Sequence, residues 1–565
     1  MAQKLMTPGV YIEEVNAFPG SVVEVATAVP AFIGYTEKAS RNGKSLVNQP
    51  TRITSFQEYS LLFGGAFFPK FKLDPPGDSA KHLFTINGVT KAINYLTDHD
   101  SYMFYGIKFF FDNGGGTCYI VSVGTYGGKD DQGNDKVVAV DKDELEAGLD
   151  TLLKEQEPTM IVIPDAVKLK IDDGCYDLYK KVLAHCAKMQ SRVAILDLYD
   201  GDEVRQVGNA PGDIIAKFRE KIGSEYLNYA AAYYPWLNTS LVQNGDITFE
   251  NLDSSVDLST LLLEPAAQNV IANYPATPDA FKTALIKDKP DDLAAALKKD
   301  NPAGLDAAVG TDGKLIDGFS AGDLTTLLAS GTAETQRLLD NYIANKKRNY
   351  HLGLVATSPT YVNLLNEIRA MINVRPASAA MAGIYTMVDN SRGVWKSPAN
   401  ISLNSVIKPA VNITHDEQEN LNVDAVSGKS INAIRTFPGV GTLVWGGRTL
   451  DGNSLDWKYI NVRRTMIMLE QSIKLALRSY VFEPNDANTW ISVKSMIINF
   501  LTEKWKQGAL AGASPADAFD VQVGLGATMT GLDILEGKML VSVKLAIVRP
   551  AEFIVVTFEQ QMQKS

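Results

Sequence analysis

The chain has 565 residues, which is enough for several domains, and its composition of 45% hydrophobic and 21% charged residues is typical of a globular protein. Its formal net charge of −11 argues against general binding to nucleic acid or to anionic membranes, because both select basic surfaces. The three cysteines provide no disulfide framework, and we predict neither a signal peptide nor a membrane-spanning run of about 18 apolar residues.

Residues 1–35 are predicted to form an extended N-terminal arm. Two short β-rich runs stand between its Pro-Gly turn signals. The first run is Val10–Ile12, and the second consists of Val22, Val23, Glu24 and Val25. Because so short a strand pair is marginal by itself, two interpretations stay open. The arm is either an edge hairpin on the chain's own domain or a segment that pairs with the sheet edge of a neighbouring molecule.

Residues 36–250 are predicted to form an α/β domain. Strand-like apolar runs alternate here with a helical stretch, and this alternation favours a parallel or mixed sheet with helices on its faces. The helical stretch is Tyr176–Met189. The predicted strands are Ile107–Phe111, Cys118–Val123, Met160–Ile163, Arg192–Leu198 and Asn228–Tyr234.

Residues 251–350 are predicted to be an inserted helical subdomain, because they are rich in Ala, Leu, Asp and Lys and contain short amphipathic pieces. Two of these pieces are Asp291–Lys298 and Ala333–Lys346. The α/β pattern is expected to resume with a strand at Leu352–Ala356 and a helix over Tyr361–Ile372. Residues 351–460 are therefore assigned to the return of the middle domain and its link to the next domain.

Residues 461–565 are predicted to form a mixed-sheet C-terminal domain. In Val462–Val481 the apolar residues recur in alternating steps of four and three, which predicts one helical stripe. A second helix is expected over Trp490–Trp505, followed by strands at Phe519–Leu525 and Lys538–Val548. The whole chain is thus predicted to be a multidomain α/β and α+β protein with extended arms at both termini.

The last apolar run forms the C-terminal arm. Its residues Ile554, Val555, Val556 and Phe558 make the run apolar on both faces, as in a strand that is covered on both sides. Two interpretations stay open for it. The run is either a central strand of the chain's own sheet or a strand donated to, or sandwiched by, a neighbouring subunit.

No catalytic, cofactor-binding or metal-binding motif is found. The two Gly-Lys-Ser tripeptides lack the first glycine of a phosphate-binding loop, because Lys38 and Val423 stand at that position. The five histidines are scattered without metal-ligand spacing. No cofactor is therefore expected, although a site assembled from distant residues would leave no such motif.

Several segments together resemble contractile tail sheath proteins of phages and of phage tail-like injection systems. They occur in the order found in that family, within the first 35 or so residues and from roughly 350 to 565. The segments are Pro8–Val15, Ala26–Gly34, Pro376–Tyr385, Arg392–Asn400, Asn432–Gly439, Val444–Leu450, Trp457–Arg464 and Val548–Ile554.

The resemblance implies a structural subunit rather than an enzyme. Such subunits stack as six-membered rings around an inner tube and contract without nucleotide, and their terminal arms complete sheets in neighbouring subunits. The implied partners are other copies, the inner tube protein, and baseplate and terminal cap proteins, without nucleic acid or membrane insertion. Assembly in the bacterial cytoplasm, as part of a phage tail or a tail-like particle, is implied as well.

The resemblance also implies a C-terminal domain that faces the tube. Lys494, Lys504 and Lys506 on the second predicted C-terminal helix are candidates for that face, with an ordinary solvated helix surface as the alternative. Two other functions remain in view for the whole chain. One is an α/β enzyme with an unrecognised site, and the other is a receptor- or carbohydrate-binding module within residues 251–350.

Overall fold

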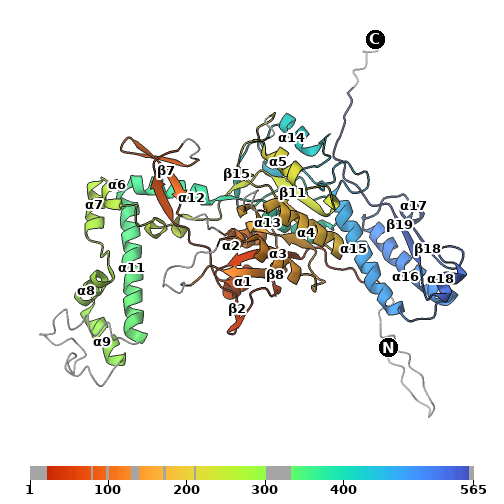
Figure 1. Ribbon diagram of the computed structural model, residues 1–565, viewed down its shortest axis with the longest axis horizontal. Helices are drawn as coiled ribbons and strands as arrows, with labels where there is room; N and C mark the ends of the chain where they lie inside the picture. The colour runs from red at the N-terminus through yellow and green to blue at the C-terminus, as the bar shows by residue number, and fades with distance from the viewer. Residues whose placement is uncertain are drawn as a thin grey trace, which may run out of the picture. The chain divides into compact units, whose positions relative to one another are not determined.

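The computed structural model of the protein describes residues 22–77, 81–96, 101–128, 139–169, 174–208, 211–300, 333–424 and 426–558. These residues form two compact units (Figure 1). Unit 1 falls within Met1–Phe67, His99–Leu241 and Asn373–Ser565, and unit 2 falls within Phe68–Asp98 and Val242–Ile372. None of the described helices combines the length and the apolar composition that a membrane crossing requires.

A nine-stranded mixed sheet forms the centre of unit 1. Its order is β14-β17-β16-β11-β10-β9-β1-β8-β4, with parallel neighbours from β16 to β8 and antiparallel strands at both ends. All seven residues of β1 are buried, because a central strand is covered on both faces. The strands are β1 (Pro30–Thr36), β4 (Thr51–Ile53), β8 (Cys118–Thr125), β9 (Met160–Val162), β10 (Val193–Asp197), β11 (Ala230–Tyr234), β14 (Ile401–Ser402), β16 (Asn432–Phe437) and β17 (Gly441–Val444).

Helices cover both faces of this sheet. From β1, the Phe32 ring contacts Phe110 of α2 at a centroid distance of 5.1 Å, whereas a Cβ added at Gly148 of α3 would lie 2.9 Å from Cγ2 of Ile33. Successive side chains of a strand point to opposite faces, so α2 and α3 lie on opposite sides of the sheet. Helix α13 packs beside α2, and α4 packs beside α3. The helices of this part are α1 (Phe56–Phe63), α2 (Met103–Asp112), α3 (Lys142–Thr151), α4 (Cys175–Met189), α5 (Ile214–Lys221), α13 (Ser378–Arg392) and α14 (His415–Asn422).

Buried aspartates join strand ends to helix starts. Asp197, the last residue of β10, accepts hydrogen bonds from the amides of Ala377 (2.8 Å) and Ser378 (2.9 Å), where α13 begins. Asp165 accepts one from the amide of Tyr102 (2.6 Å), directly before α2. A carboxylate at a helix N-terminus satisfies free amides and opposes the helix dipole. Burial raises the pKa of Asp197 to about 6, against these hydrogen bonds, which lower it.

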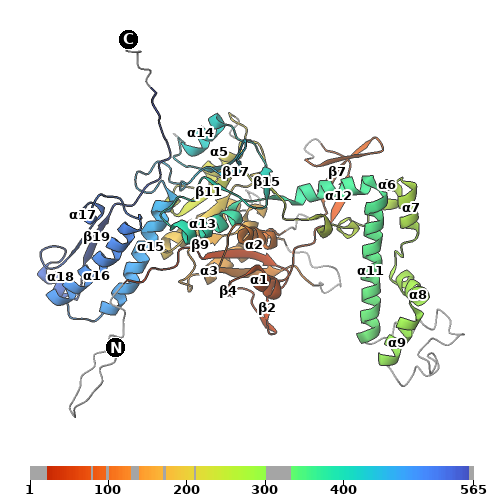
Figure 2. The same cartoon turned by 180° about the vertical axis from the view of Figure 1, so that it is seen from behind.

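A C-terminal module completes unit 1. It consists of helices α15 (Ile460–Leu477) and α16 (Ala487–Lys506), which lie side by side in both views, and of strands β18 (Phe519–Val523) and β19 (Val541–Leu545) (Figures 1 and 2). Helix α16 begins at Asp486, whose side chain accepts a hydrogen bond from the amide of Thr489. Both predicted helices and both predicted strands of this module are confirmed, although β19 covers only the central part of the predicted Lys538–Val548.

Helix α15 belongs to two cores. Ile467 packs into the core around the large sheet, whereas Met468, Leu469 and Ile473 pack into the core of the C-terminal module. Arg463 and Arg464 are buried as well, at 5% and 4% exposure. The prediction of a single apolar stripe was therefore too narrow, because this helix is covered on several sides.

Unit 2 combines a small antiparallel sheet, in the order β5-β7-β6, with a set of helices. Phe281, Leu285, Leu293, Leu339 and Tyr342 form a buried cluster that joins three of the helices. The elements are β5 (Phe71–Asp74), β6 (Leu83–Ile86), β7 (Val89–Tyr95), α6 (Leu258–Leu261), α7 (Pro265–Ala272), α8 (Pro278–Asp288), α9 (Pro290–Asp300), α11 (Ala333–Thr357) and α12 (Pro359–Ile372).

Two predicted strands are helical in the structure. Ile107–Phe111 lies in α2, and Leu352–Ala356 lies in α11. A short apolar run fits a buried helix as well as a strand, and length and flanking residues decide between them. In both cases the run is part of a helix of at least ten residues.

The unit boundaries also differ from those predicted. The N-terminal arm, predicted as 1–35, ends before Pro30, because β1 lies inside the large sheet. Unit 2 contains the predicted helical insertion 251–350 together with residues 68–98, and it extends to Ile372. The return to unit 1 therefore comes at Asn373 rather than at residue 351. Val10–Ile12 lies outside the described residues.

Candidate assembly site at the two terminal segments

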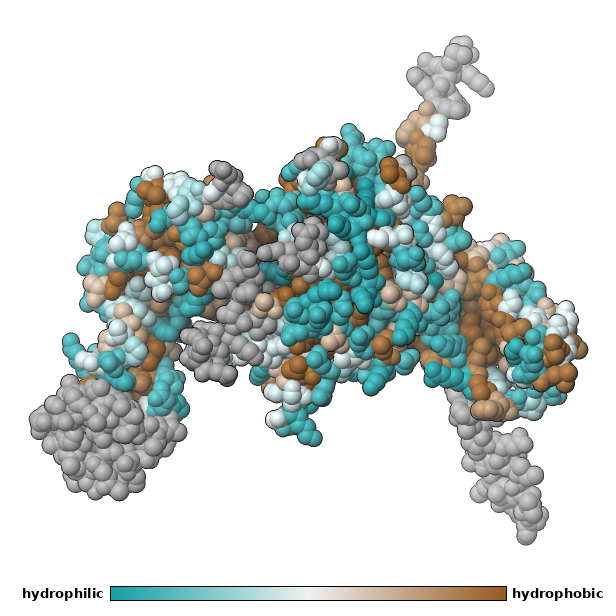
Figure 3. Space-filling view, in the orientation of Figure 1, coloured by the Kyte–Doolittle hydropathy of each residue, from teal (hydrophilic) through white to brown (hydrophobic). Residues whose placement is uncertain are grey.

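The C-terminal segment, residues 549–558, is extended and pairs with no strand of the described chain. Its side chains are largely exposed, at 71% for Phe553, 79% for Ile554, 88% for Val555, 65% for Val556 and 92% for Phe558. In Figure 3 this apolar stretch stands clear of the rest of the surface. The interpretation as a central strand of the chain's own sheet is therefore wrong for the single molecule.

Such an exposed segment is energetically unfavourable in an isolated subunit. Burying a Val, Ile or Phe side chain gives about 1.5–3 kcal/mol, and monomeric proteins rarely leave a contiguous apolar stretch uncovered. The segment therefore has the properties of a binding element that a partner surface covers.

An ion pair fixes the base of the C-terminal segment. Glu552 accepts two hydrogen bonds from Nε of Arg448 (3.0 and 3.2 Å) and one from its Nη2 (2.7 Å). Asn422 Nδ2 (2.7 Å) and the Tyr459 hydroxyl (3.1 Å) donate to the same carboxylate. Burial raises the pKa of Glu552, but the hydrogen bonds from Arg448 and Asn422 outweigh it, so that the pKa is lowered. The segment thus leaves the fold from a fixed point.

The N-terminal segment, residues 22–29, is held along its length as well. The amide of Val25 donates to Oγ of Ser472 on α15 (3.1 Å), and the amide of Val29 donates to Oγ1 of Thr159 (3.0 Å). Between them, the carbonyl oxygen of Thr27 accepts a hydrogen bond from Nη2 of Arg464 (2.9 Å). Residues 22–26 form no strand with the described chain.

The arginine that holds Thr27 belongs to a buried ion pair. Nη1 and Nη2 of Arg464 donate to the two carboxylate oxygens of Asp389 on α13, at 2.9 and 2.6 Å. The two side chains are 4% and 2% exposed, and the guanidinium lies 4.7 Å from the ring centroid of Tyr385. This bidentate geometry fixes the distance between α15 and α13 and, through Thr27, the course of the N-terminal segment.

Lys504 does not belong to an exposed face. Its side chain is 4% exposed and forms an ion pair with Glu24 of the N-terminal segment. Its Nζ also donates to Oε1 of Gln507 (2.8 Å). The prediction that Lys504 faces an inner tube is therefore wrong, because the arm itself covers and neutralises this lysine. Lys494 and Lys506 are exposed on α16, and their role stays a prediction.

Strands β18 and β19 form a sheet of only two strands, with Phe519 opposite Leu545 and Val523 opposite Val541. One face packs Phe519, Val521, Val541, Val543 and Leu545 into a cluster with α15 and α16, and all of these except Val521 remain half-buried. Within the described chain, no further strand pairs with the outer edge of β18 or of β19. Two-stranded sheets are marginal and unpaired edges accept strands from other chains, so this sheet is incomplete in the single subunit.

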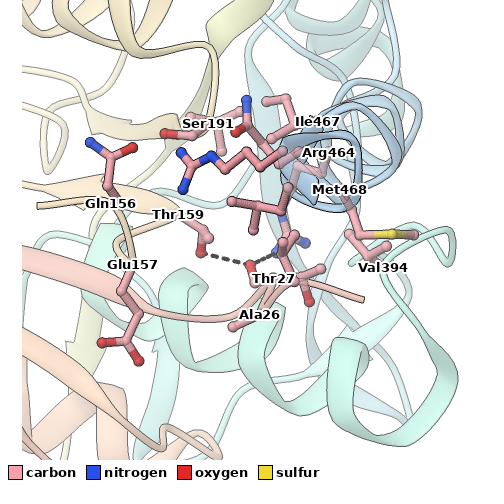
Figure 4. Close-up of a pocket in the computed structure, with 15 residues that line it drawn as sticks. Ala26, Thr27, Gln156, Glu157, Thr159, Ser191, Val394, Arg464, Ile467 and Met468 are labelled. Atoms are coloured by element: carbon pink, nitrogen blue, oxygen red, sulfur yellow. Dashed lines mark hydrogen bonds between the residues drawn. The ribbon is translucent and has the colours of Figure 1, made fainter. Parts of the chain in front are cut away.

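A cavity of about 380 Å³ lies beside the N-terminal segment, between α15 and the loops before β9 and β10 (Figure 4). The Thr27 carbonyl at its side accepts hydrogen bonds from Arg464 and from Oγ1 of Thr159 (2.8 Å). Most of the remaining wall is apolar, with Ile467 and Met468 from α15. Oγ of Ser191, a residue that is 7% exposed, lines the cavity without a hydrogen-bond partner among the described residues.

An α/β protein with an incomplete sheet, unpaired strand edges and an exposed apolar terminus belongs to the class of proteins suited to assembly by strand addition. A family model described as phage tail sheath C-terminal domain matches residues 453–561. The tail sheath protein of Vibrio phage KVP40 is 30% identical over 127 residues, and that of Enterobacteria phage T4 is 29% identical over 129 residues.

Solved structures match nearly the whole chain. The sheath of an extracellular contractile injection system, PVC, in the contracted state is 25% identical, with a TM-score of 0.55 and coverage of 99% of both chains. The contracted helical sheath of the anti-feeding prophage is 26% identical, with a TM-score of 0.52, and the match covers 99% of this chain and 100% of that chain. Residues 453–561 thus resemble the C-terminal domain of phage tail sheath proteins, and the chain as a whole is similar to the sheaths of contractile injection systems.

The sequence relatives match only in part. The matched regions make up 22% of this chain, and the chain covers 19% of the length of the KVP40 and T4 proteins. The match to the family model lies at residues 453–561, whereas the structural similarity covers nearly the whole chain.

Sequence reasoning missed the two arginine pairs. Arg448, Arg464, Asp389 and Glu552 all lie in or beside segments on which the family resemblance rests, but no pairing among them was predicted. The available signal was the presence of charged residues inside otherwise apolar segments, since charges in such positions need partners.

Proposed function

We propose that the protein polymerises as stacked six-subunit rings around an inner tube and that this sheath contracts to drive the tube through a target envelope. The extended lattice stores the free energy, and contraction re-docks the subunits in a wider and shorter arrangement. The role is structural, without catalysis or a cofactor. This proposal is supported by the similarity to contractile sheath proteins of phage tails and of contractile injection systems.

The observation that carries the proposal is that one molecule contains both an unpaired apolar segment and an incomplete sheet. The C-terminal segment exposes its apolar side chains and belongs to no sheet of the described chain; these side chains are Ile554, Val555, Val556 and Phe558. The β18–β19 sheet has no further strand of the described chain at either edge. A donated strand from a neighbouring copy satisfies the unpaired backbone groups and covers the apolar side chains. We propose that the N-terminal run Val22, Val23, Glu24 and Val25 leads a second arm towards another neighbour.

The remaining surfaces follow from this arrangement. The C-terminal module faces the inner tube, with Lys494 and Lys506 as tube-facing candidates, and unit 2 forms the outer bulk of the sheath. Baseplate and terminal cap proteins bind the ends of the polymer. Assembly takes place in the bacterial cytoplasm. A similar chain, 25% identical, comes from the baseplate of the anti-feeding prophage, which supports a baseplate partner for this chain.

A matched pair of variants at one residue tests strand donation. Val555→Pro removes an amide donor and restricts the backbone, so it prevents ladder hydrogen bonds, whereas Val555→Thr keeps a β-branched side chain and the amide. Val555 is 88% exposed in the subunit, so neither change disturbs its fold. We expect tubes or stacked rings in negative-stain micrographs for the wild type and Val555→Thr, and none for Val555→Pro. Tubes of normal length formed by Val555→Pro would refute strand donation by this segment.

A truncation tests the N-terminal arm separately. Removing residues 1–21 leaves the ion pair of Glu24 with Lys504 intact, so the subunit stays folded. We expect short assemblies or single rings instead of long polymers, measured by electron microscopy and sedimentation velocity. Long polymers from the truncated chain would show that this arm is dispensable.

A further inference from the structure

Phe482 is presented to solvent in an unusual way. It lies between α15 and α16, its side chain is fully exposed (102%), and its backbone has a φ of 75°. The neighbouring Val481 is 60% exposed. Backbone hydrogen bonds tie the loop down on both sides, from the amide of Glu483 to the carbonyl of Tyr480 (3.2 Å) and from the amide of Asp486 to that of Pro484 (3.0 Å).

Phe482 is energetically unfavourable in the isolated subunit for two reasons. A non-glycine residue in the left-handed region costs about 1–3 kcal/mol, and a phenyl ring in water forgoes about as much again in burial. Nothing in the described chain covers the ring. Among the described aromatic residues of unit 1 outside the C-terminal segment, Phe482 has the largest exposed fraction. These properties identify a side chain that is held outward for a partner.

The cavity beside the N-terminal segment has the size and chemistry to receive such a ring. Its volume of about 380 Å³ exceeds that of a single phenylalanine side chain, and Val193, Val394, Ile467, Met468 and Leu475 supply apolar walls. The buried hydroxyl of Ser191 has no partner among the described residues, and Figure 4 places it at the cavity. A backbone carbonyl of an entering loop would satisfy this hydroxyl, since a buried polar group without a partner is costly.

The charges beside ring and cavity are complementary. Arg478 lines the cavity and is exposed, and Glu483 follows Phe482 directly and is exposed as well. Neither residue forms an ion pair with another described residue. A loop that places its Phe482 ring in the cavity of another copy would therefore bring its Glu483 close to Arg478 at the edge of that cavity.

We propose that Phe482 of one copy inserts into this cavity of a second copy, with Glu483 of the first copy meeting Arg478 of the second. The inference rests on the proposed self-assembly and adds a contact that involves neither terminal strand. The ring of the second copy can in turn enter the cavity of a third copy, so the contact can continue from copy to copy along a polymer. The inserted ring would pack against α15 next to the N-terminal segment, so it would also brace the root of that arm.

Site-specific cross-linking tests the contact directly. A Phe482→Cys variant is mixed with a Leu475→Cys variant under assembly conditions and oxidised, and covalent dimers are measured on a denaturing gel. The native Cys118, Cys175 and Cys186 are fully buried and do not react in the folded protein. We expect at least tenfold more dimer from this mixture than from either variant alone.

A matched control uses another exposed position of the same module. Leu535 is 85% exposed on α18 (Gly531–Leu535) and lies away from the cavity lining. Phe482→Cys mixed with Leu535→Cys is expected to give no more dimer than Phe482→Cys alone. Equal yields from the Leu475 and Leu535 mixtures would overturn the proposed contact.

Charge reversal provides a second, independent readout. Glu483→Arg alone and Arg478→Glu alone each place like charges at the contact, and we expect each to raise the concentration needed for tube formation about tenfold. The double variant restores opposite charges between copies and is expected to assemble near the wild-type concentration. Failure of the double variant to recover, with both single variants impaired, would overturn the pairing of Glu483 with Arg478.

The outcomes separate this contact from the function on which it rests. Tubes of wild-type protein without the cross-link would overturn the Phe482 contact and leave strand donation standing. The absence of rings and tubes from the wild type, with and without a tube partner, would overturn the proposed self-assembly and this contact with it.

Discussion

The buried pair of Arg464 and Asp389 allows a quantitative prediction. Asp389→Asn removes the negative charge with little change of shape and leaves a guanidinium that is 4% exposed without its counter-charge. Removing one partner of a buried ion pair costs about 3–5 kcal/mol, because the remaining charge stays desolvated. We expect a loss of this size in the free energy of unfolding of unit 1.

Tryptophan fluorescence isolates the relevant transition. All six tryptophans of the chain lie within unit 1, so emission excited at the tryptophan band reports urea unfolding of that unit without a contribution from unit 2. A chain with two units does not unfold as one two-state system, and this separation is needed to assign a free energy to one of them.

The same substitution should loosen the N-terminal segment. Arg464 also donates to the Thr27 carbonyl, so the amides of Val25 and Val29 on either side should exchange hydrogen faster in the Asp389→Asn variant. The control is Asp177→Asn on α4, whose pair with Lys180 is exposed and should contribute at most about 1 kcal/mol. Equal losses of stability in the two variants, or unchanged exchange at both amides, would refute this account of the anchor.

Three further predictions concern single positions. The pKa of Glu552 is lowered, so its ion pair with Arg448 should hold above about pH 4.5 and break as the pH falls through the lowered value. Proteolysis of the C-terminal segment should therefore accelerate at that pH. The Glu552→Gln variant should be cleaved quickly at every pH. The pH dependence should be opposite for Asp197, because its pKa in the folded protein is raised to about 6. Its contribution to the stability of unit 1 should fall by about 3 kcal/mol as the pH rises from 4 through 6. The difference in unfolding free energy between the wild type and Asp197→Asn should change by that amount. Gly148→Ala should cost about 1–3 kcal/mol in urea unfolding, because the new Cβ would lie 2.4 Å from Cγ1 of Val123, whereas Ala147→Gly on the same helix should cost at most about 1 kcal/mol.

The fold was predictable where local pattern determines structure. The alternation in Lys538–Val548 and the spacing in Val462–Val481 each follow one period, and each produced the expected strand or helix. Ile107–Phe111 is too short and too uniformly apolar to show a period, and it was assigned to the wrong element. The boundaries of unit 2 were missed for a different reason: residues 68–98 join it across about 150 residues of chain, a distance over which local pattern carries no information.

The assembly site was predictable in its apolar parts and not in its charged parts. The C-terminal run was recognisable as apolar on both faces, but the sequence left open whether the chain's own sheet or a neighbouring subunit covers it, and the structure leaves it exposed. The position of Lys504 was not recognisable, since its burial depends on Glu24, 480 residues earlier in the chain. The local sequence around Lys504 is that of an ordinary solvated lysine on a helix, and only the distant contact with Glu24 buries it.

The two arginine pairs explain how arms that pair with neighbours could remain attached to a subunit that moves. If the arms cross to other copies as proposed, tension on the N-terminal segment first meets the contacts of Glu24 with Lys504 and of Val25 with Ser472. It then reaches Thr27, passes to Arg464 and enters α13 through Asp389. Tension on the C-terminal segment reaches Glu552 and then Arg448, beside the edge of the large sheet. Each load thus ends on a charge pair with several hydrogen bonds rather than on β18 and β19, whose own ladder is short. The donated strands can then change their angle to the subunit while their roots stay fixed, which is what a lattice needs if its subunits rotate without separating.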